Sequence, residues 1–208
     1  MQVIVLTRRD FREFDQIISC YSLDKGKIDL LARGVKKITS KNSAQLEPFS
    51  YVDVEIIFGK ELAHLGTVQP INYFVNIRQN LQKSLAAAYL VMFLNKLVEI
   101  GEHDKKIFDI LLSWLEFVNQ VEKFNLVLSD AFIVKLLFLL GFDITQADEL
   151  TSELEKDLEM LNNGEWRLIN QLKFEDGEYQ KLHNFIYKFT VFQTEKDFKN
   201  WLNLAKSC

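Results

Sequence analysis

The order of apolar and polar residues divides the chain into two parts. Before about residue 78, short β-rich segments alternate with turn residues, a pattern typical of strands. Gly26 can supply the positive φ of a tight turn between the second and third segments. Five or six short strands at these intervals predict a small closed barrel, with a plain β-sandwich as the alternative. The clearest expected strands cover residues 3–6, 14–21, 27–33, 51–58 and 62–68.

Beyond residue 78, the apolar positions take the spacing of helices. The first helical segment, 85–100, is apolar on nearly all sides, which predicts a helix inside a bundle. Ser84 is its candidate N-cap. Further helices are expected at 105–120, 125–140, 146–161, 177–189 and 194–204.

These patterns predict an α+β chain of two domains, a β-barrel at residues 1–78 and an all-α helical domain at residues 79–208. The connection between them, residues 74–83, has no Pro/Gly/Ser-rich linker. We therefore expect the two domains to dock against each other and not to swing freely.

Composition narrows the class of protein. The chain has 208 residues, 48% of them hydrophobic, which is enough to bury a core and shows no signature of disorder. Its net charge of -4 is unevenly placed: residues 1–80 hold 11 Lys and Arg against 9 Asp and Glu, whereas residues 81–208 hold 14 against 20. A polyanion is therefore expected to meet the N-terminal part first.

The apolar runs predict a cytoplasmic protein that does not enter a membrane. The run near the N-terminus is too short for a signal peptide. The longest apolar run, residues 85–94, is about half of a membrane span.

The search for catalytic and metal-binding motifs finds none. The sequence has no Gly-rich phosphate loop, no Gly-x-Ser-x-Gly elbow and no His-Glu-x-x-His. Cys20 and Cys208 form neither a disulfide framework nor a Cys-x-x-Cys pair. The three histidines, His64, His103 and His183, are far apart in the sequence. We therefore expect a binding protein and not an enzyme, without a metal or cofactor.

Basic residues cluster around the expected barrel. Residues 30–46 contain four cations and no acidic residue, and a flexible basic loop of this kind suits sequence-independent contacts with phosphates. Tyr21, Phe49 and Tyr51 are candidates for stacking on unpaired bases, although Phe49 is better interpreted as a core residue. The expected nucleic-acid-binding residues are Arg9, Arg12, Lys25, Lys27, Arg33, Lys36, Lys37 and Lys41.

Several short motifs of the first part follow the order found in one bacterial family. They comprise an acidic pair before a strand, a Gly turn, an Ala-Arg-Gly basic loop, a Ser-Lys pair and Leu-x-Pro-Phe, at residues 13–19, 24–28, 31–37, 40–41 and 46–49. With the continuation at 52–55, Gly59 and Leu65, this region closely resembles the N-terminal domain of the recombination mediator RecO family. The helical part resembles that family more loosely, at residues 86–89 and 139–142.

The resemblance implies an OB-fold at the N-terminus and a DNA-repair function. Members of the family bind single- and double-stranded DNA, anneal complementary strands, and contact RecR and the C-terminal tail of single-strand-binding protein. Together with RecR they help to load RecA onto coated DNA. Many relatives carry a four-cysteine zinc module after the Leu-Gly-aromatic motif. The corresponding stretch from Asp143 onward has no cysteine and is acidic, so the module is absent and zinc is not expected.

Two other functions stay open at this point. An OB-fold RNA-binding factor would prefer structured RNA to single-stranded DNA in a competition assay. A protein-only adaptor would use the barrel to bind a protein, and micromolar protein would then not shift a single-stranded oligonucleotide in a gel.

Overall fold

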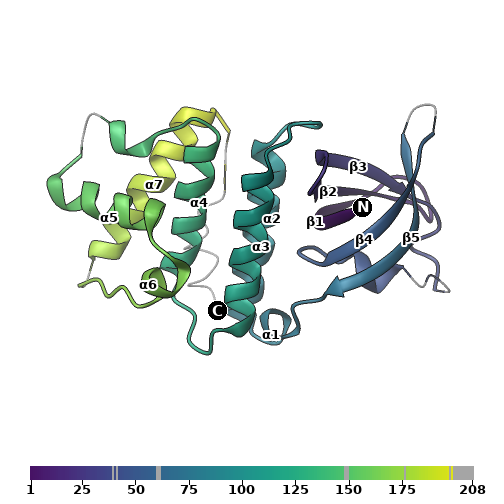
Figure 1. Cartoon of the computed structure of the whole chain (residues 1–208), viewed down its shortest axis with the longest axis horizontal. Helices are drawn as coiled ribbons and strands as arrows, with labels where there is room; N and C mark the ends of the chain where they lie inside the picture. Colours follow the sequence, from purple (N-terminus) through teal and green to yellow (C-terminus); the bar gives the residue numbers. More distant parts are fainter. Residues whose placement is uncertain are drawn as a thin grey trace.

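The computed structural model combines a β-barrel with a helical bundle, and α2 (Leu81–Leu97) and α3 (Lys105–Gln120) stand between the barrel and the helices that follow them in the chain (Figure 1). The structure describes residues 1–38, 40, 42–59, 62–147, 150–175, 177–196 and 198.

Five strands form a closed barrel in the order β1-β2-β3-β5-β4, with β4 pairing back to β1. The β3–β5 pair is parallel and the other pairs are antiparallel. This closure excludes the β-sandwich and is consistent with the expected OB-fold. The strands are β1 (Gln2–Asp10), β2 (Gln16–Ser22), β3 (Gly26–Ala32), β4 (Tyr51–Ile57) and β5 (Ala63–Asn72), and a short 3-10 helix, η1 (Ser43–Leu46), precedes β4.

The alternation of side chains along β1 explains why its first half is wholly apolar. Val3 and Val5 point into the barrel and pack in its core. Ile4 and Leu6 point outward and belong to a second core, which they share with the helices. Because both faces of β1 are buried, no polar position interrupts residues 3–6.

The helices follow β5 along the chain. They are α1 (Val75–Arg78), α2 (Leu81–Leu97), α3 (Lys105–Gln120), α4 (Val127–Leu139), α5 (Ser152–Asn163), α6 (Trp166–Asn170) and α7 (Glu178–Thr194), with a 3-10 turn, η2 (Ile144–Gln146), after α4. α2 touches β1 on one side and α4 on another, which accounts for the apolar residues around its circumference. The prediction of a helix inside the bundle is confirmed.

Several predictions about helix ends are wrong. α5 begins at Ser152 and not at residue 146, and α7 continues to Thr194 beyond the expected end at residue 189. The N-cap of α2 is Asn80 and not Ser84, since the Asn80 side chain accepts a hydrogen bond from the Lys83 N–H at 3.0 Å. A helix starting at residue 194 is also not found, because Thr194 is the last residue of α7. Residues 195, 196 and 198 are not helical, and the rest of that predicted helix lies outside the described residues.

The barrel and the helical bundle are in direct contact at the β2–β3 hairpin. Gly26 has φ +66°, as the turn prediction required, and a Cβ there would lie 1.9 Å from the Glu102 carbonyl oxygen. The Tyr21 hydroxyl lies 3.1 Å from both the backbone N and the backbone O of Asp104, at the start of α3. The hairpin is therefore fixed against the loop between α2 and α3.

Two searches of the described residues give no candidate. None of the described helices combines the length and the hydropathy that crossing a membrane requires. No three His, Cys, Asp or Glu side chains in the described part of the chain gather as potential ligands of one metal ion.

Candidate nucleic-acid interface

The predicted basic loop lies beside the β1–β2 turn, residues 11–15. The Lys36 N–H donates to the Phe14 carbonyl at 3.1 Å, and the Gly34 N–H donates to Asp15 Oδ1 at 2.8 Å. Gly34 has φ +63°, a conformation that favours glycine, and this bends the chain toward the turn. Two segments that are some twenty residues apart in sequence thus form one end of the barrel.

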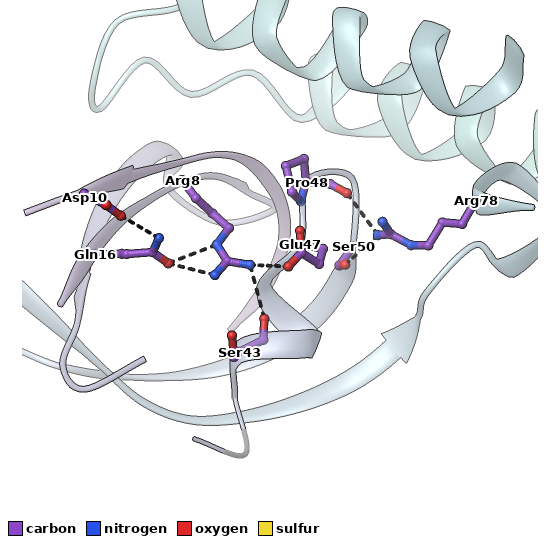
Figure 2. A network of polar contacts seen from close by, with 8 residues as sticks. All are labelled: Arg8, Asp10, Gln16, Ser43, Glu47, Pro48, Ser50 and Arg78. Atoms are coloured by element: carbon purple, nitrogen blue, oxygen red, sulfur yellow. Dashed lines mark hydrogen bonds and ion pairs between the residues drawn. The ribbon is translucent and has the colours of Figure 1, made fainter. Parts of the chain in front are cut away.

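A second group of contacts holds the far end of the basic loop (Figure 2). Arg8, inside β1, forms an ion pair with Glu47 and donates to the Ser43 carbonyl at 3.3 Å. Its guanidinium also donates to Gln16 Oε1 at 2.8 and 3.0 Å, and the Gln16 amide donates to Asp10 Oδ1 at 2.9 Å. Arg8 is therefore occupied in holding η1 to the barrel, and the loop is anchored on both sides.

Arg78 extends this network to the helical part. Its guanidinium donates to the Pro48 carbonyl at 3.0 Å and to Ser50 Oγ at 2.9 Å (Figure 2). It also lies 4.0 Å from the centre of the Phe49 ring. Burial of this guanidinium lowers the pKa of Arg78. The Pro-Phe motif is thus a packing site for Arg78, which agrees with the core interpretation of Phe49.

Three cations at this end of the barrel, Arg12, Lys36 and Lys37, are exposed. Lys36 Nζ lies 2.7 Å from Asp10 Oδ2, and this hydrogen bond is the main reason why the pKa of Asp10 is lowered. Lys37 lies over the Phe14 ring at 5.6 Å, and Arg12 lies over the Phe11 ring at 5.0 Å. Apart from the Lys36–Asp10 pair, these contacts leave the charges open to an incoming anion.

Two further exposed arginines lie near the basic loop, Arg9 in β1 and Arg33 directly after β3. Arg9 points out of β1 with its side chain 62% exposed, and its guanidinium lies 2.9 Å from Asp29 Oδ2 on β3. Arg33 follows β3 directly, is exposed, and approaches His64 Nε2 at 3.3 Å. Both can extend a phosphate track from the loop over the barrel surface.

The structure does not bring Lys25 and Lys27 to the basic loop. Both belong to the β2–β3 hairpin, whereas the basic loop lies at the other end of β2. The seven residues of β2 separate the two ends by about 20 Å, at a rise of ~3.3 Å per residue. Lys25 is exposed over the Phe58 ring at 4.7 Å. Lys27 instead donates to the carbonyls of Asn95 and Val98 at the end of α2, at 2.5 and 2.7 Å. We therefore leave Lys27 out of the predicted phosphate track, because its part-buried ammonium is hydrogen-bonded to the end of α2. Lys41 lies outside the described residues.

The aromatic residues named from the sequence are not available for stacking. Tyr21, Phe49 and Tyr51 are all buried, in the core shared by barrel and helices. The exposed rings near the basic loop are Phe11 and Phe14. A local signal in the sequence could have revealed them. Both stand among charged residues in the turn sequence Asp-Phe-Arg-Glu-Phe-Asp, and an aromatic residue without apolar neighbours in sequence is more often exposed than buried in a core.

The charge balance at this end of the barrel is clearly positive. Residues 8–16 and 33–38, all of them described by the structure, together contain six Lys and Arg against three Asp and Glu. Exposed cations on a rigid support bind phosphates whatever the base sequence, and they release counterions when they do so. The geometry therefore suits a sequence-independent, salt-sensitive contact with a nucleic-acid backbone.

Comparison with known proteins relates both parts of the chain to one family. Residues 1–74 match the family described as "Recombination protein O N terminal", and residues 78–153 match "Recombination protein O C terminal". Among curated proteins, the chain is 32% identical over 119 residues to DNA repair protein RecO of Geobacter sulfurreducens. It is 31% identical over 118 residues to DNA repair protein RecO of Desulforamulus reducens. Both alignments cover 57% of this chain, and 49% and 46% of the respective relatives. The chain thus spans about half the length of the relatives that it matches.

Proposed function

Since the chain belongs to the RecO family of DNA-repair proteins, we propose that it is a recombination mediator that binds single- and double-stranded DNA through the basic end of its barrel. The observation that carries the proposal is the exposed cluster of Arg12, Lys36 and Lys37 on two loops that are hydrogen-bonded to each other. Arg9 and Arg33 extend the contact, and Lys41 is included on its sequence position alone.

The proposed mechanism is electrostatic. Two complementary strands repel each other through their phosphates, and cations that neutralise both backbones lower the barrier to pairing. The helical part, which has an excess of acidic residues, stays off the DNA. No step requires bond making or breaking, so annealing and the loading of RecA onto DNA coated with single-strand-binding protein need no catalytic group.

Two protein partners are proposed from the family: RecR and the C-terminal tail of single-strand-binding protein. A surface pocket of about 340 Å³ between α3, α4 and the end of α5 supports the second partner. The pocket combines the apolar side chains of Ile110, Phe138 and Leu139 with two lysines, Lys106 and Lys135, and one acid, Asp109. An apolar chain end with acidic neighbours fits these features. DNA as the ligand also implies a cytoplasmic location at the nucleoid.

The test of the DNA site is a double charge reversal, Lys36→Glu with Lys37→Glu. At moderate salt, fluorescence anisotropy with a labelled single-stranded oligonucleotide should show several-fold weaker binding, and strand annealing should slow down. The matched control, Lys181→Glu with Lys188→Glu, makes the same charge change on exposed positions of α7 and should leave both unchanged. Unchanged affinity in the loop variant would refute the site. Preferential binding of structured RNA would favour the RNA-binding alternative, and no binding of any oligonucleotide would favour the protein adaptor.

A further inference from the structure

The β1–β2 turn presents two phenylalanines to solvent in a fixed conformation. The side chains of Phe11 and Phe14 are each 43% exposed. The turn is closed by hydrogen bonds from the N–H groups of Phe11 and Arg12 to the Asp15 carbonyl, at 3.2 and 3.5 Å. The basic loop braces the turn through the Lys36 N–H. The fold therefore holds the two rings at the surface. Burying their apolar area in the barrel core would have stabilised the protein, so their exposure gives up that stabilisation.

Each ring is matched with a cation from the proposed DNA site. Arg12 lies over Phe11 and Lys37 over Phe14, at 5.0 and 5.6 Å from the ring centres. Ile38, next to Lys37, is fully exposed. This surface places apolar groups beside cations over a few residues, with Asp10, which is paired with Lys36, and Glu13 among them. Unpaired nucleic acid has the complementary chemistry, because each nucleotide joins an apolar base face to an anionic phosphate.

We propose that Phe11 and Phe14 stack on unpaired bases of the strand whose phosphates contact Arg12, Lys36 and Lys37. This inference rests on the proposed DNA-binding function and adds a source of selectivity to it. Bases in a duplex are already stacked and paired, so the two rings contribute to the binding of single strands and not of duplexes. Stacking releases no counterions, so the rings raise affinity without changing the salt slope.

The test compares three labelled ligands on the full chain: a single-stranded oligothymidylate, an abasic strand of the same length, and a duplex. Phe11→Ala with Phe14→Ala should weaken oligothymidylate binding roughly 5-fold or more for each ring that stacks, because base–aromatic stacking is worth about 1–3 kcal/mol. Affinity for the duplex should change less than two-fold, and so should affinity for the abasic strand. The slope of log affinity against log salt should stay the same.

Two control variants separate stacking from other effects. Phe192→Ala removes a ring that is 79% exposed on α7, and should leave all three affinities unchanged. Phe11→Tyr with Phe14→Tyr keeps both rings and should bind like the native chain; if it loses as much affinity as the alanine variant, the rings do not act by stacking.

The outcomes distinguish this inference from the proposed function. Equal losses for oligothymidylate and duplex, or no loss for either, overturn the stacking role while leaving phosphate binding in place. In the second case, the exposed rings fit a protein partner better. A native chain that binds none of the three ligands overturns the proposed function itself.

Discussion

Charged groups serve opposite purposes in the basic loop and in the helical body. In the loop, Lys36 and Lys37 point toward solvent, and their contacts are with an exposed carboxylate and an aromatic ring. In the helical body, the ammonium groups of two lysines, Lys83 and Lys135, point inward to the last carbonyls of helices. Lys83 donates to the Val121 carbonyl after α3 at 2.5 Å, and Lys135 donates to the Asn162 carbonyl at the end of α5 at 2.6 Å.

This difference follows from the chemistry of helix ends. The last carbonyls of a helix have no partner within the helix, and a cation placed there satisfies them and opposes the negative end of the dipole. Burial lowers the pKa values of Lys27, Lys83 and Lys135, which is the cost of removing these ammonium groups from water. Lys27, Lys83 and Lys135 therefore stabilise the fold at helix ends, whereas Lys36 and Lys37 are available for the proposed contact with DNA.

The largest effect is expected from a buried acid of the helical body. Asp130 is fully buried in α4, accepts a hydrogen bond from the Tyr179 hydroxyl at 2.7 Å, and lies 2.9 Å from His183 Nδ1. Asp130→Ala should lower the free energy of unfolding by about 3–5 kcal/mol, because it removes the buried carboxylate whose contacts with Tyr179 and His183 hold α7 to α4. Urea unfolding measures this. Asp109→Ala removes an acid of a solvent-exposed pair with Lys105 and should cost at most about 0.5 kcal/mol. Similar losses in the two variants would contradict the interpretation.

A smaller loss is expected at the hairpin that joins the two parts. Lys27→Met keeps the aliphatic stem but leaves the Asn95 and Val98 carbonyls without their donor, so it should cost about 1–3 kcal/mol in urea unfolding. Lys25→Met, two residues away on the exposed side of the hairpin, should change stability by less than about 0.5 kcal/mol. If both variants unfold at the same urea concentration as the native chain, Lys27 does not join the barrel to α2.

The smallest effect concerns the titration of one carboxyl group. The hydrogen bond from Lys36 lowers the pKa of Asp10 below 3.8, so this pair stabilises the fold above that pH and the contribution is lost as the pH falls through the lowered pKa. Lys36→Gln should raise the pKa of Asp10 toward 3.8 in an NMR titration of the side-chain carboxyl. Lys37→Gln, whose ammonium is not hydrogen-bonded to Asp10, should leave it in place. A rise in both variants would show that the general charge of the loop, and not the Lys36 contact, sets the pKa.

The architecture could be predicted because it depends on local patterns. The β-rich segments between turn residues and the Gly26 turn predicted the strands, and the helical spacing predicted α3 within its observed limits. Helix limits were less certain at α2, where both Asn80 and Ser84 have side chains that can cap a helix. The structure favours Asn80 because Leu81 and the residues after it continue the helix.

The functions of individual cations and aromatics could not be predicted, because their partners are distant in sequence. Lys27 and Lys36 both stand near turns in a basic region, yet only Lys27 meets a helix end, some seventy residues farther along the chain. Tyr21 has an aromatic ring that could stack on a base, but its hydroxyl is hydrogen-bonded to the backbone of Asp104. Whether Lys27 and Tyr21 face solvent or the helices depends on how the barrel docks on the helical part.

The salt dependence of binding to a single-stranded oligonucleotide tests the contrast between outward and inward cations most directly. The slope of log affinity against log salt falls by about 0.7 for each phosphate contact removed from a single strand. Lys36→Gln with Lys37→Gln should therefore reduce the slope by about 1.4, whereas Lys27→Gln should leave it at the native value. An unchanged slope in the loop variant, or an equal reduction in the Lys27 variant, would contradict the account.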